Sequence, residues 1–205
     1  MNFYSQYGQD KFIIENFFKN KTTGFYVDIG ANDGINLSNT KTLEEIGWKG
    51  VCVEPLPDKY GQLIENRISE CLNIAISNKD DILDFLFVEG YPQMLSGLVE
   101  NYNPKHLERI KFEIENYGGK SQVISVQSKR FSDIIDEVEI DYVSIDVEGS
   151  ELSILESIDF DKHNIKLFSV ESNYEQDNQK IVDFLESKNY FYIKSIGCDN
   201  FFARK

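Results

Sequence analysis

A glycine-containing loop at residues 30–34 constrains the fold of this chain more than any other feature. An apolar run, 25–29, leads into the loop sequence Gly-Ala-Asn-Asp-Gly, and a helix-like segment follows over 37–46. A second apolar run, 51–53, then ends in Glu54. This order of strand, glycine loop, helix, strand and acid is typical of a doubly wound α/β sheet that binds a nucleoside-containing cofactor at its strand ends. We expect the helix N-terminus to offer free N–H groups to an anionic part of that ligand.

The loop departs from the G-x-G-x-x-G pattern of dinucleotide sites, because Asn32 stands where a second glycine would approach a pyrophosphate. A cofactor without pyrophosphate is therefore favoured, and S-adenosylmethionine fits. We expect Gly30 and Gly34 to allow close backbone approach or positive φ. Glu54, at the tip of the second strand, is expected to accept both ribose hydroxyls. Asp28 either contacts the ligand or braces the loop, and an ordinary glycine turn in a structural βαβ unit remains the alternative for the whole motif.

Composition excludes several classes of partner. The 205 residues carry a formal net charge of −14, which disfavours binding to phosphate backbones or anionic lipid. Three cysteines without C-x-x-C spacing and two isolated histidines do not predict a disulfide framework or a zinc site. No segment resembles a signal peptide or reaches membrane-spanning length. We therefore expect a cytoplasmic protein with no nucleic-acid or membrane partner; its oligomeric state is open.

Strand-like and helix-like segments alternate along the chain without repeats or linkers, which predicts one α/β domain over 1–205. We expect a doubly wound, mostly parallel, seven-stranded sheet with a C-terminal antiparallel hairpin. The expected helices are 9–19, 37–46, one opened by Pro57, 104–117, 131–135, 150–158 and 176–188. The expected strands are 25–29, 51–54, 72–76, 82–88, 123–126, 142–147 and 166–171, with the hairpin at 192–196 and 201–203.

Six short blocks occur in an order that resembles one protein family. They are SQYGQD (5–10), VDIGANDG (27–34), SNT (38–40), VEP (53–55), NIAIS (73–77) and IDVEGSE (145–151). Together they resemble the FkbM family of S-adenosylmethionine-dependent methyltransferases. The resemblance covers nearly the whole chain. It implies the class I methyltransferase fold and O-methylation of a hydroxyl on a sugar, glycan or polyketide-like acceptor.

The blocks also suggest cofactor contacts beyond the glycine loop. In the family resemblance the segment 5–10, with Gln9, closes over the cofactor; the alternative for this segment is capping of the first helix. Ser38 in the SNT block is a further expected contact. Ala75 and Ile76 end the expected third strand, where the adenine ring should lie, although core packing explains them almost as well.

Three acidic residues at strand ends are the candidate catalytic groups. Asp146 and Glu148 follow the strand at 142–147, and Glu171 closes the next strand. A neutral hydroxyl must lose its proton during or before attack, so any of the three is a candidate general base or acceptor-binding group. Asp146 is also an expected cofactor contact. The alternative for the cluster is capping of the helix that begins at Ser150.

A metal site is the minority alternative at this position. Asp146, Glu171 and Asn173 offer the oxygen ligands that Mg²⁺ prefers, but we expect no metal. The segment 89–119 is an expected lid or acceptor-binding insertion, and His106 within it is expected to be an exposed helix residue.

Two other functions compete with methyl transfer. A nicotinamide-dependent oxidoreductase is disfavoured by the missing pyrophosphate glycine and by the expected C-terminal hairpin. The other alternative is a module that binds S-adenosylmethionine without catalysis.

Overall fold

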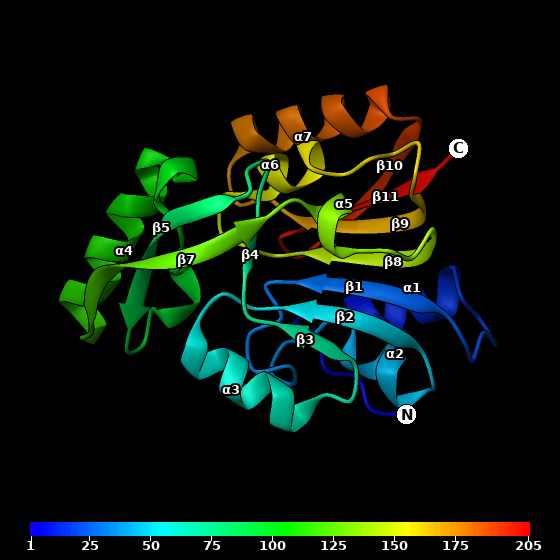
Figure 1. Ribbon diagram of the computed structural model, residues 1–205, viewed down its shortest axis with the longest axis horizontal. Coiled ribbons are helices and arrows are strands. Elements are labelled where there is room, and N and C mark those ends of the chain that lie inside the picture. The colour runs from blue at the N-terminus through cyan, green and yellow to red at the C-terminus, as the bar shows by residue number, and fades with distance from the viewer.

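The computed structural model describes residues 1–205 and contains two sheets, which Figure 1 shows side by side. The main sheet has seven strands in the order β10-β11-β9-β8-β1-β2-β3, and all of them run in one direction except β11, which is antiparallel to β10 and β9. This confirms the expected doubly wound sheet with a C-terminal hairpin. The strands are β1 (Phe25–Ile29), β2 (Lys49–Val53), β3 (Glu70–Leu72), β8 (Glu139–Ile145), β9 (Asn164–Glu171), β10 (Tyr190–Ile196) and β11 (Asp199–Arg204).

Helices cover both faces of the main sheet. Alternation along β1 shows how: Val27 and Ile29 join the core on one face, whereas Tyr26 joins the core on the other. The first face is covered by α5 (Phe131–Ile134), α6 (Glu151–Glu156) and α7 (Glu175–Ser187). The second is covered by α1 (Gln9–Asn16), α2 (Lys41–Glu45) and α3 (Pro57–Asn66). Two apolar cores therefore hold the parallel strands, and the strand ends are left free for a site.

A second, four-stranded sheet lies beside the first and was not predicted from the sequence. Its order is β4-β7-β5-β6, and only β4 and β7 are parallel. The strands are β4 (Ala75–Ile76), β5 (Asp81–Glu89), β6 (Gly97–Leu98) and β7 (Lys120–Lys129). Between β5 and β7 the chain forms two 3₁₀ turns, η1 (Gln93–Leu95) and η2 (Val99–Asn101), and α4 (Pro104–Tyr117), drawn in green in Figure 1.

The expected strand over 72–76 is wrong as a single element. The chain breaks at Asn73, whose side-chain amide donates to the carbonyl oxygens of Glu54 and Pro55 at 2.9 and 3.0 Å. These bonds turn the backbone out of the main sheet, so that β3 pairs with β2 while β4 pairs with β7. The expected strands at 82–88 and 123–126 exist, but as parts of the second sheet.

The expected helix over 37–46 is also too long. Leu37 has a left-handed backbone (φ 59°), and the Ser38 hydroxyl accepts bonds from the N–H groups of Thr40 and Lys41. These local bonds compete with helix formation, so α2 begins only at Lys41. The helix N-terminus therefore does not follow the glycine loop directly. The remaining expected helices exist within a few residues of their expected ends. None of the helices has both the length and the apolar character needed to span a bilayer.

Candidate functional site

The carboxyl ends of the main-sheet strands border a cavity of about 340 Å³. Its lining brings together most of the residues that the sequence singles out, from segments far apart in the chain. These are Gln9, Asp28, Gly30, Asn32, Ser38 and Glu54 of the expected cofactor contacts and Asp146, Glu148 and Glu171 of the expected catalytic groups. The cavity lies at the switch point of the sheet, between β1 and β8, as is usual for ligands of doubly wound folds.

Gly30 has a strict geometric requirement. Its φ is +85°, and a Cβ atom there would lie 1.8 Å from the Asp146 carbonyl oxygen. Any side chain would therefore force the ends of β1 and β8 apart. The Gly30 and Ala31 N–H groups both donate to the Val53 carbonyl at 3.0 Å. The loop is thus fixed to the end of β2, directly beside Glu54.

Glu54 is held at the cavity by backbone. Its carboxylate accepts bonds from the N–H groups of Asn32 at 2.9 Å and Leu56 at 2.8 Å. The side chain is 6% exposed, and burial raises its pKa to about 7. Each carboxylate oxygen can accept a further bond, so the geometry leaves room for a diol on the cavity side.

Asp28 braces the loop. Its Oδ2 accepts from the Nη2 of Arg67 at 3.1 Å and from the Thr40 hydroxyl. Burial raises the pKa of Asp28, and the charge of Arg67 opposes that shift. Of the two roles expected for Asp28, the structure shows the bracing contacts, while its place in the cavity lining leaves ligand contact open.

Arg67 is the residue that sequence reasoning missed. Its side chain is fully buried, and it donates to the Gly34 carbonyl oxygen, the Tyr26 hydroxyl, Asp28, and the hydroxyls of Ser38 and Thr40. A lone arginine at a helix end carries no sequence signal for such a role. It ties the end of the loop at Gly34 to Tyr26 and Asp28 of β1.

Three of the expected cofactor contacts, Gly34, Ala75 and Ile76, do not line the main cavity. Gly34 is outside the cavity lining and packs against Leu63 and Arg67, where a Cβ would come within 3 Å of both. Ala75 and Ile76 are buried in β4 and line a small adjoining hollow that shares Gly30 and Val147 with the main cavity. The structure shows the core packing of Ala75 and Ile76, and their contact with the adenine ring remains a prediction.

The N-terminal segment reaches over the cavity. Gln9 donates to Asp199 of β11 at 2.6 Å and accepts from the Tyr7 N–H at 2.8 Å. Gln6, Tyr7 and Gln9 line the cavity. The Ser5 hydroxyl also accepts from the Asp10 N–H at 3.3 Å, in the first turn of α1. Ser5 therefore bonds the first turn of α1, although the N-cap residue is Gly8 and has no side-chain cap. That the segment closes over the cofactor remains a prediction.

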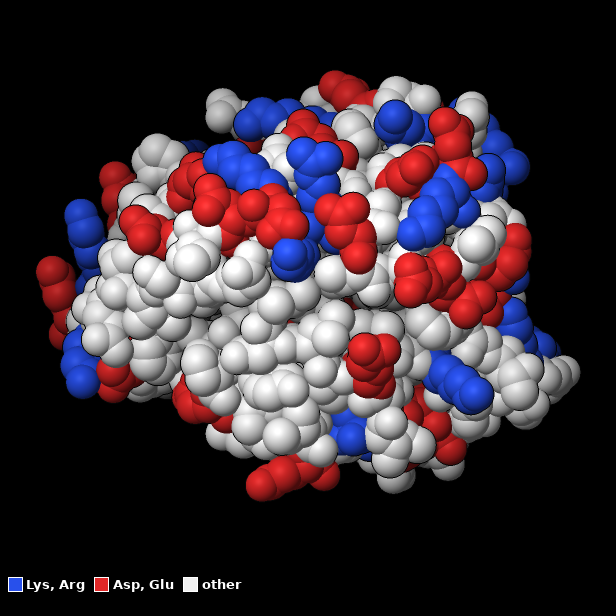
Figure 2. Space-filling view, in the orientation of Figure 1, with Lys and Arg blue, Asp and Glu red and all other residues white.

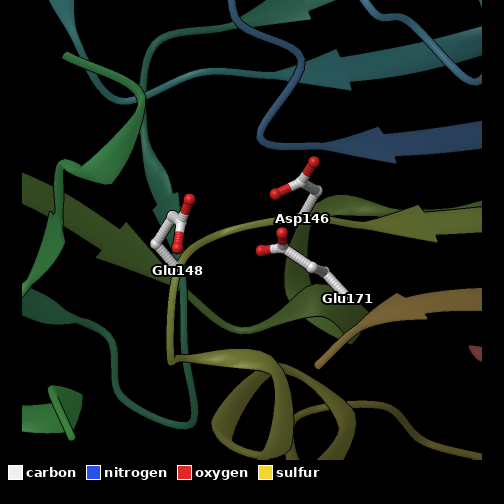
Figure 3. A group of neighbouring side chains, drawn as sticks. All are labelled: Asp146, Glu148 and Glu171. Carbon is white, nitrogen blue, oxygen red and sulfur yellow. The ribbon is translucent and has the colours of Figure 1, made fainter. Parts of the chain in front are cut away.

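The three candidate catalytic carboxyls meet at one point. Asp146, Glu148 and Glu171 each have an oxygen within 4.8 Å of the others, and Figure 3 shows the three groups pointing into the same space. Asp146 follows β8 and is open to the cavity, whereas Glu171 ends β9 and is 7% exposed. Glu148 has a left-handed backbone with φ 59°, an unfavourable conformation for a residue other than glycine, asparagine or aspartate.

These carboxyls hold their protons more tightly than free acids do. Burial and the charge of Asp146 raise the pKa of Glu148 to about 8. Burial and the charge of Glu148 raise the pKa of Glu171 to about 8. Enclosure by the surrounding protein, with the charges of Glu171 and Asp199, raises the pKa of Asp146 well above its ordinary range. Such shifts are typical of groups that exchange protons near neutral pH.

Asn173 and His106 complete the surroundings of Glu148. The Asn173 amide donates to Glu148 Oε2 at 3.3 Å. The oxygen ligands that lie together are therefore those of Asp146, Glu148 and Glu171, with Glu148 in the place that the sequence suggested for Asn173. His106 is 1% exposed, and its Nδ1 lies 3.6 Å from Glu148 Oε2. The expectation that His106 is an exposed helix residue is therefore wrong, because Tyr102, Tyr174 and the Leu95 carbonyl surround its ring.

The segment 89–119 supplies the other side of the cavity. Residues 93–96, in and after η1, line it together with Arg109 of α4. Met94 is 53% exposed at the mouth, and Tyr91 packs against Tyr117 with ring centroids 4.8 Å apart. That this segment moves as a lid remains a prediction.

Several hydrogen-bond acceptors in the cavity lining have no donor within the protein, and the expected cofactor can be compared with them. Four of its buried side-chain oxygens have no hydrogen-bond partner within the protein: Asn32 Oδ1, Asn39 Oδ1, Glu171 Oε2 and Asp199 Oδ1. Buried acceptors without partners are costly, so a ligand with several donors is favoured. S-adenosylmethionine has an ammonium, two ribose hydroxyls and an adenine amino group. The lining residues therefore fit it.

Comparisons with known proteins agree with the sequence blocks. The sequence model described as "Methyltransferase FkbM domain" matches residues 28–192. A comparison with curated proteins gives no match. Among solved structures, the chain is similar to precorrin-6y C5,15-methyltransferase from Geobacter metallireducens GS-15, with a TM-score of 0.42 and 12% identity over 88% of this chain and 78% of that chain. It is also similar to a putative rRNA-methylase from Clostridium thermocellum, with a TM-score of 0.48 and 7% identity over 98% of this chain and 96% of that chain.

Proposed function

The chain belongs to the FkbM methyltransferase family, and from this we propose that it methylates a hydroxyl group of a sugar, glycan or polyketide-like acceptor. S-adenosylmethionine is the methyl donor. The family assignment sets aside the nicotinamide-dependent alternative. The observation that carries the proposal is the convergence of three carboxyls on the cavity at the ends of β8 and β9.

The residues divide between holding the cofactor and handling the acceptor. When bound, S-adenosylmethionine supplies an electrophilic methyl group on a sulfonium. Glu54 accepts the ribose hydroxyls, and the loop at 30–34 holds the backbone around them. Asp28 and Arg67 keep that loop rigid. Positioning of this kind does much of the work in an in-line displacement.

Glu148 takes the proton that the acceptor hydroxyl releases. A carboxyl with a pKa near 8 is matched to a proton that must leave near neutral pH. Asp146 and Glu171 bind the acceptor hydroxyls from the other side. Residues 93–96 and Arg109 then determine which acceptor is admitted.

The acceptor is a small molecule or a glycan. Besides the charge of −14, Figure 2 shows acidic and basic side chains interspersed on the face it draws, a distribution that does not suit a phosphate backbone or anionic lipid. A cytoplasmic location and the absence of nucleic-acid and membrane partners belong to this proposal.

The decisive experiment separates chemistry from folding. Asp146→Asn and Glu148→Gln should keep the fold and most of the affinity for S-adenosylhomocysteine, while kcat on a panel of sugar and polyketide-like alcohols falls by about 10²–10⁴-fold. Glu115→Gln, an exposed position on α4, is the matched control. Variants that unfold far below wild type with activity per folded molecule intact would instead assign the two residues to capping. Binding without turnover on any acceptor would favour a non-catalytic module.

A further inference from the structure

His106 occupies a position that nothing in the expected mechanism explains. It lies in the first turns of α4, is 1% exposed, and stacks on Tyr102 with ring centroids 4.8 Å apart and planes at 20°. The edge of Tyr174 faces it at 6.4 Å. These two aromatic contacts hold the imidazole ring of His106 in a single orientation relative to Glu148.

The hydrogen bonds of His106 define its tautomer. Its Nε2 lies 3.1 Å from the Leu95 carbonyl oxygen, which can only accept, so Nε2 carries the hydrogen. The Tyr102 hydroxyl donates to the same carbonyl at 2.8 Å. In the neutral ring Nδ1 therefore carries no hydrogen and has a free lone pair. It lies 3.6 Å from Glu148 Oε2. A proton between these two atoms makes the contact attractive, and its removal makes the contact repulsive.

The cavities place His106 behind Glu148. Glu148 lines both the main cavity and a smaller one of about 20 Å³, whereas His106 lines only the smaller one, together with Asn103, Tyr174 and Asp177. His106 thus contacts Glu148 from the side opposite the acceptor. It can act on the reaction only through that carboxyl.

We propose that His106 is a positioning residue that forms a pair with Glu148: it aims the carboxyl at the acceptor and shares the proton that the carboxyl removes. This inference rests on the proposed function. The acceptor oxygen gains a bond to the methyl carbon and loses its proton to Glu148, and the carbon–sulfur bond breaks with its electron pair remaining on sulfur. The released proton is held between Glu148 Oε2 and His106 Nδ1.

Other charged groups around Glu148 favour retention of that proton. Asp146, Glu151 and Glu113 raise the cost of a negative charge on Glu148, while Arg109 lowers it. Burial lowers the pKa of His106 and Arg109 acts in the same direction, whereas the bond to the Leu95 carbonyl and the charge of Glu113 oppose this shift without reversing it. The ring is therefore neutral at neutral pH and able to receive a proton.

Ring-nitrogen NMR tests the pair without an acceptor. The chain has only two histidines, and the other, His163, is equally buried with its Nδ1 2.8 Å from the Glu137 carbonyl, so His163→Asn assigns the spectrum. We expect the His106 signals to follow a titration whose midpoint moves by more than about 0.5 pH unit in Glu148→Gln, because interacting groups titrate together. Signals of His163 should not move. An unchanged His106 midpoint would overturn the pair.

Kinetics separate the pair from mere packing. His106→Gln keeps a donor for Leu95 but has no base at the Nδ1 position, so kcat should fall at least about tenfold with affinity for S-adenosylhomocysteine unchanged and the pH–rate profile displaced. His163→Asn controls for the loss of a buried histidine. Wild-type kcat and pH profile in folded His106→Gln would overturn the proposal, even if Glu148→Gln is inactive and the proposed function stands.

Discussion

At the scale of single residues, the Glu54 carboxylate binds the backbone after β1 and after β2, and we expect it to bind the ribose hydroxyls as well. It holds the N–H groups of Asn32 and Leu56, and its remaining acceptor capacity faces the cavity. Glu54→Ala should weaken binding of S-adenosylhomocysteine by about 1–3 kcal/mol, since two hydroxyls lose a charged acceptor. Parallel calorimetric titrations with S-adenosylhomocysteine and NAD measure this, and NAD should bind neither form. Unchanged affinity in folded Glu54→Ala would remove Glu54 from the ribose site.

The acid trio also permits a test for metal. Asp146, Glu148 and Glu171 lie close enough to hold an ion, with Asn173 bonded to Glu148 beside them. We nevertheless expect activity to survive EDTA, because carboxylates with raised pKa values can remove the proton themselves. The rate should rise with pH until the base is ionised. Activity lost in EDTA and restored by Mg²⁺, but not in Glu171→Gln, would make the site a metal clamp.

At the scale of elements, the connection between β1 and α2 depends on one buried arginine. Arg67, at the end of α3, bonds Asp28 and the Gly34 carbonyl and lies 3.9 Å from Glu44. Arg67→Met leaves Asp28 buried without a cation, while Glu44 keeps its ion pair with Lys41 at 3.0 Å, so the free energy of unfolding should fall by about 3–5 kcal/mol. Equilibrium urea unfolding measures the loss.

Two comparisons make that test specific. Arg130→Met, at an exposed position, should change the unfolding free energy by less than about 0.5 kcal/mol. Adding Asp28→Asn to Arg67→Met should recover part of the loss, because the uncompensated charge disappears. A cost below about 1 kcal/mol for Arg67→Met would mean that water or lysine side chains replace the guanidinium.

The elements also show how far sequence reasoning reaches. Runs such as 26–29 and 142–145 are buried on both faces of the sheet, and their order with the helices predicted the main sheet. An apolar run does not indicate which strand it will pair with. The second sheet, in which β5 and β7 are the two long strands, was therefore not predicted. The burial of His106 and the role of Arg67 were not predicted for a related reason: a single polar residue on a helix, or directly after one, has no periodic signal that says what will cover it.

At the scale of the whole molecule, the cavity concentrates negative charge in a protein that is already acidic. Glu54, Glu148, Glu171 and Asp199 all line it, and burial raises the pKa of each, to about 7, 8, 8 and 6. The net charge of −14 adds to the repulsion. Ionising the site therefore works against the folded state until a ligand with matching donors is bound.

The pH dependence of stability follows from these shifts. A carboxyl whose pKa is raised on folding binds more protons in the folded than in the unfolded state between its two pKa values, so stability falls as pH rises through that window. For Glu148 and Glu171 the window runs from about 4.5 to about 8. The lowered pKa values of the two histidines oppose this trend only below about 6.5, their unfolded value.

The fall should therefore be clearest between pH 6.5 and 8.5. We expect the Tm of the unliganded protein to drop there by several degrees, since each kcal/mol shifts Tm by about 2–4 °C in a chain of this length. Thermal unfolding at constant ionic strength measures it. Glu171→Gln should flatten the curve, because the amide cannot ionise, while Glu115→Gln on the surface should leave it unchanged. A Tm that stays level or rises across this range in the wild type would show that the cavity carboxyls ionise without cost, and Glu148 would then be charged too early to hold a shared proton.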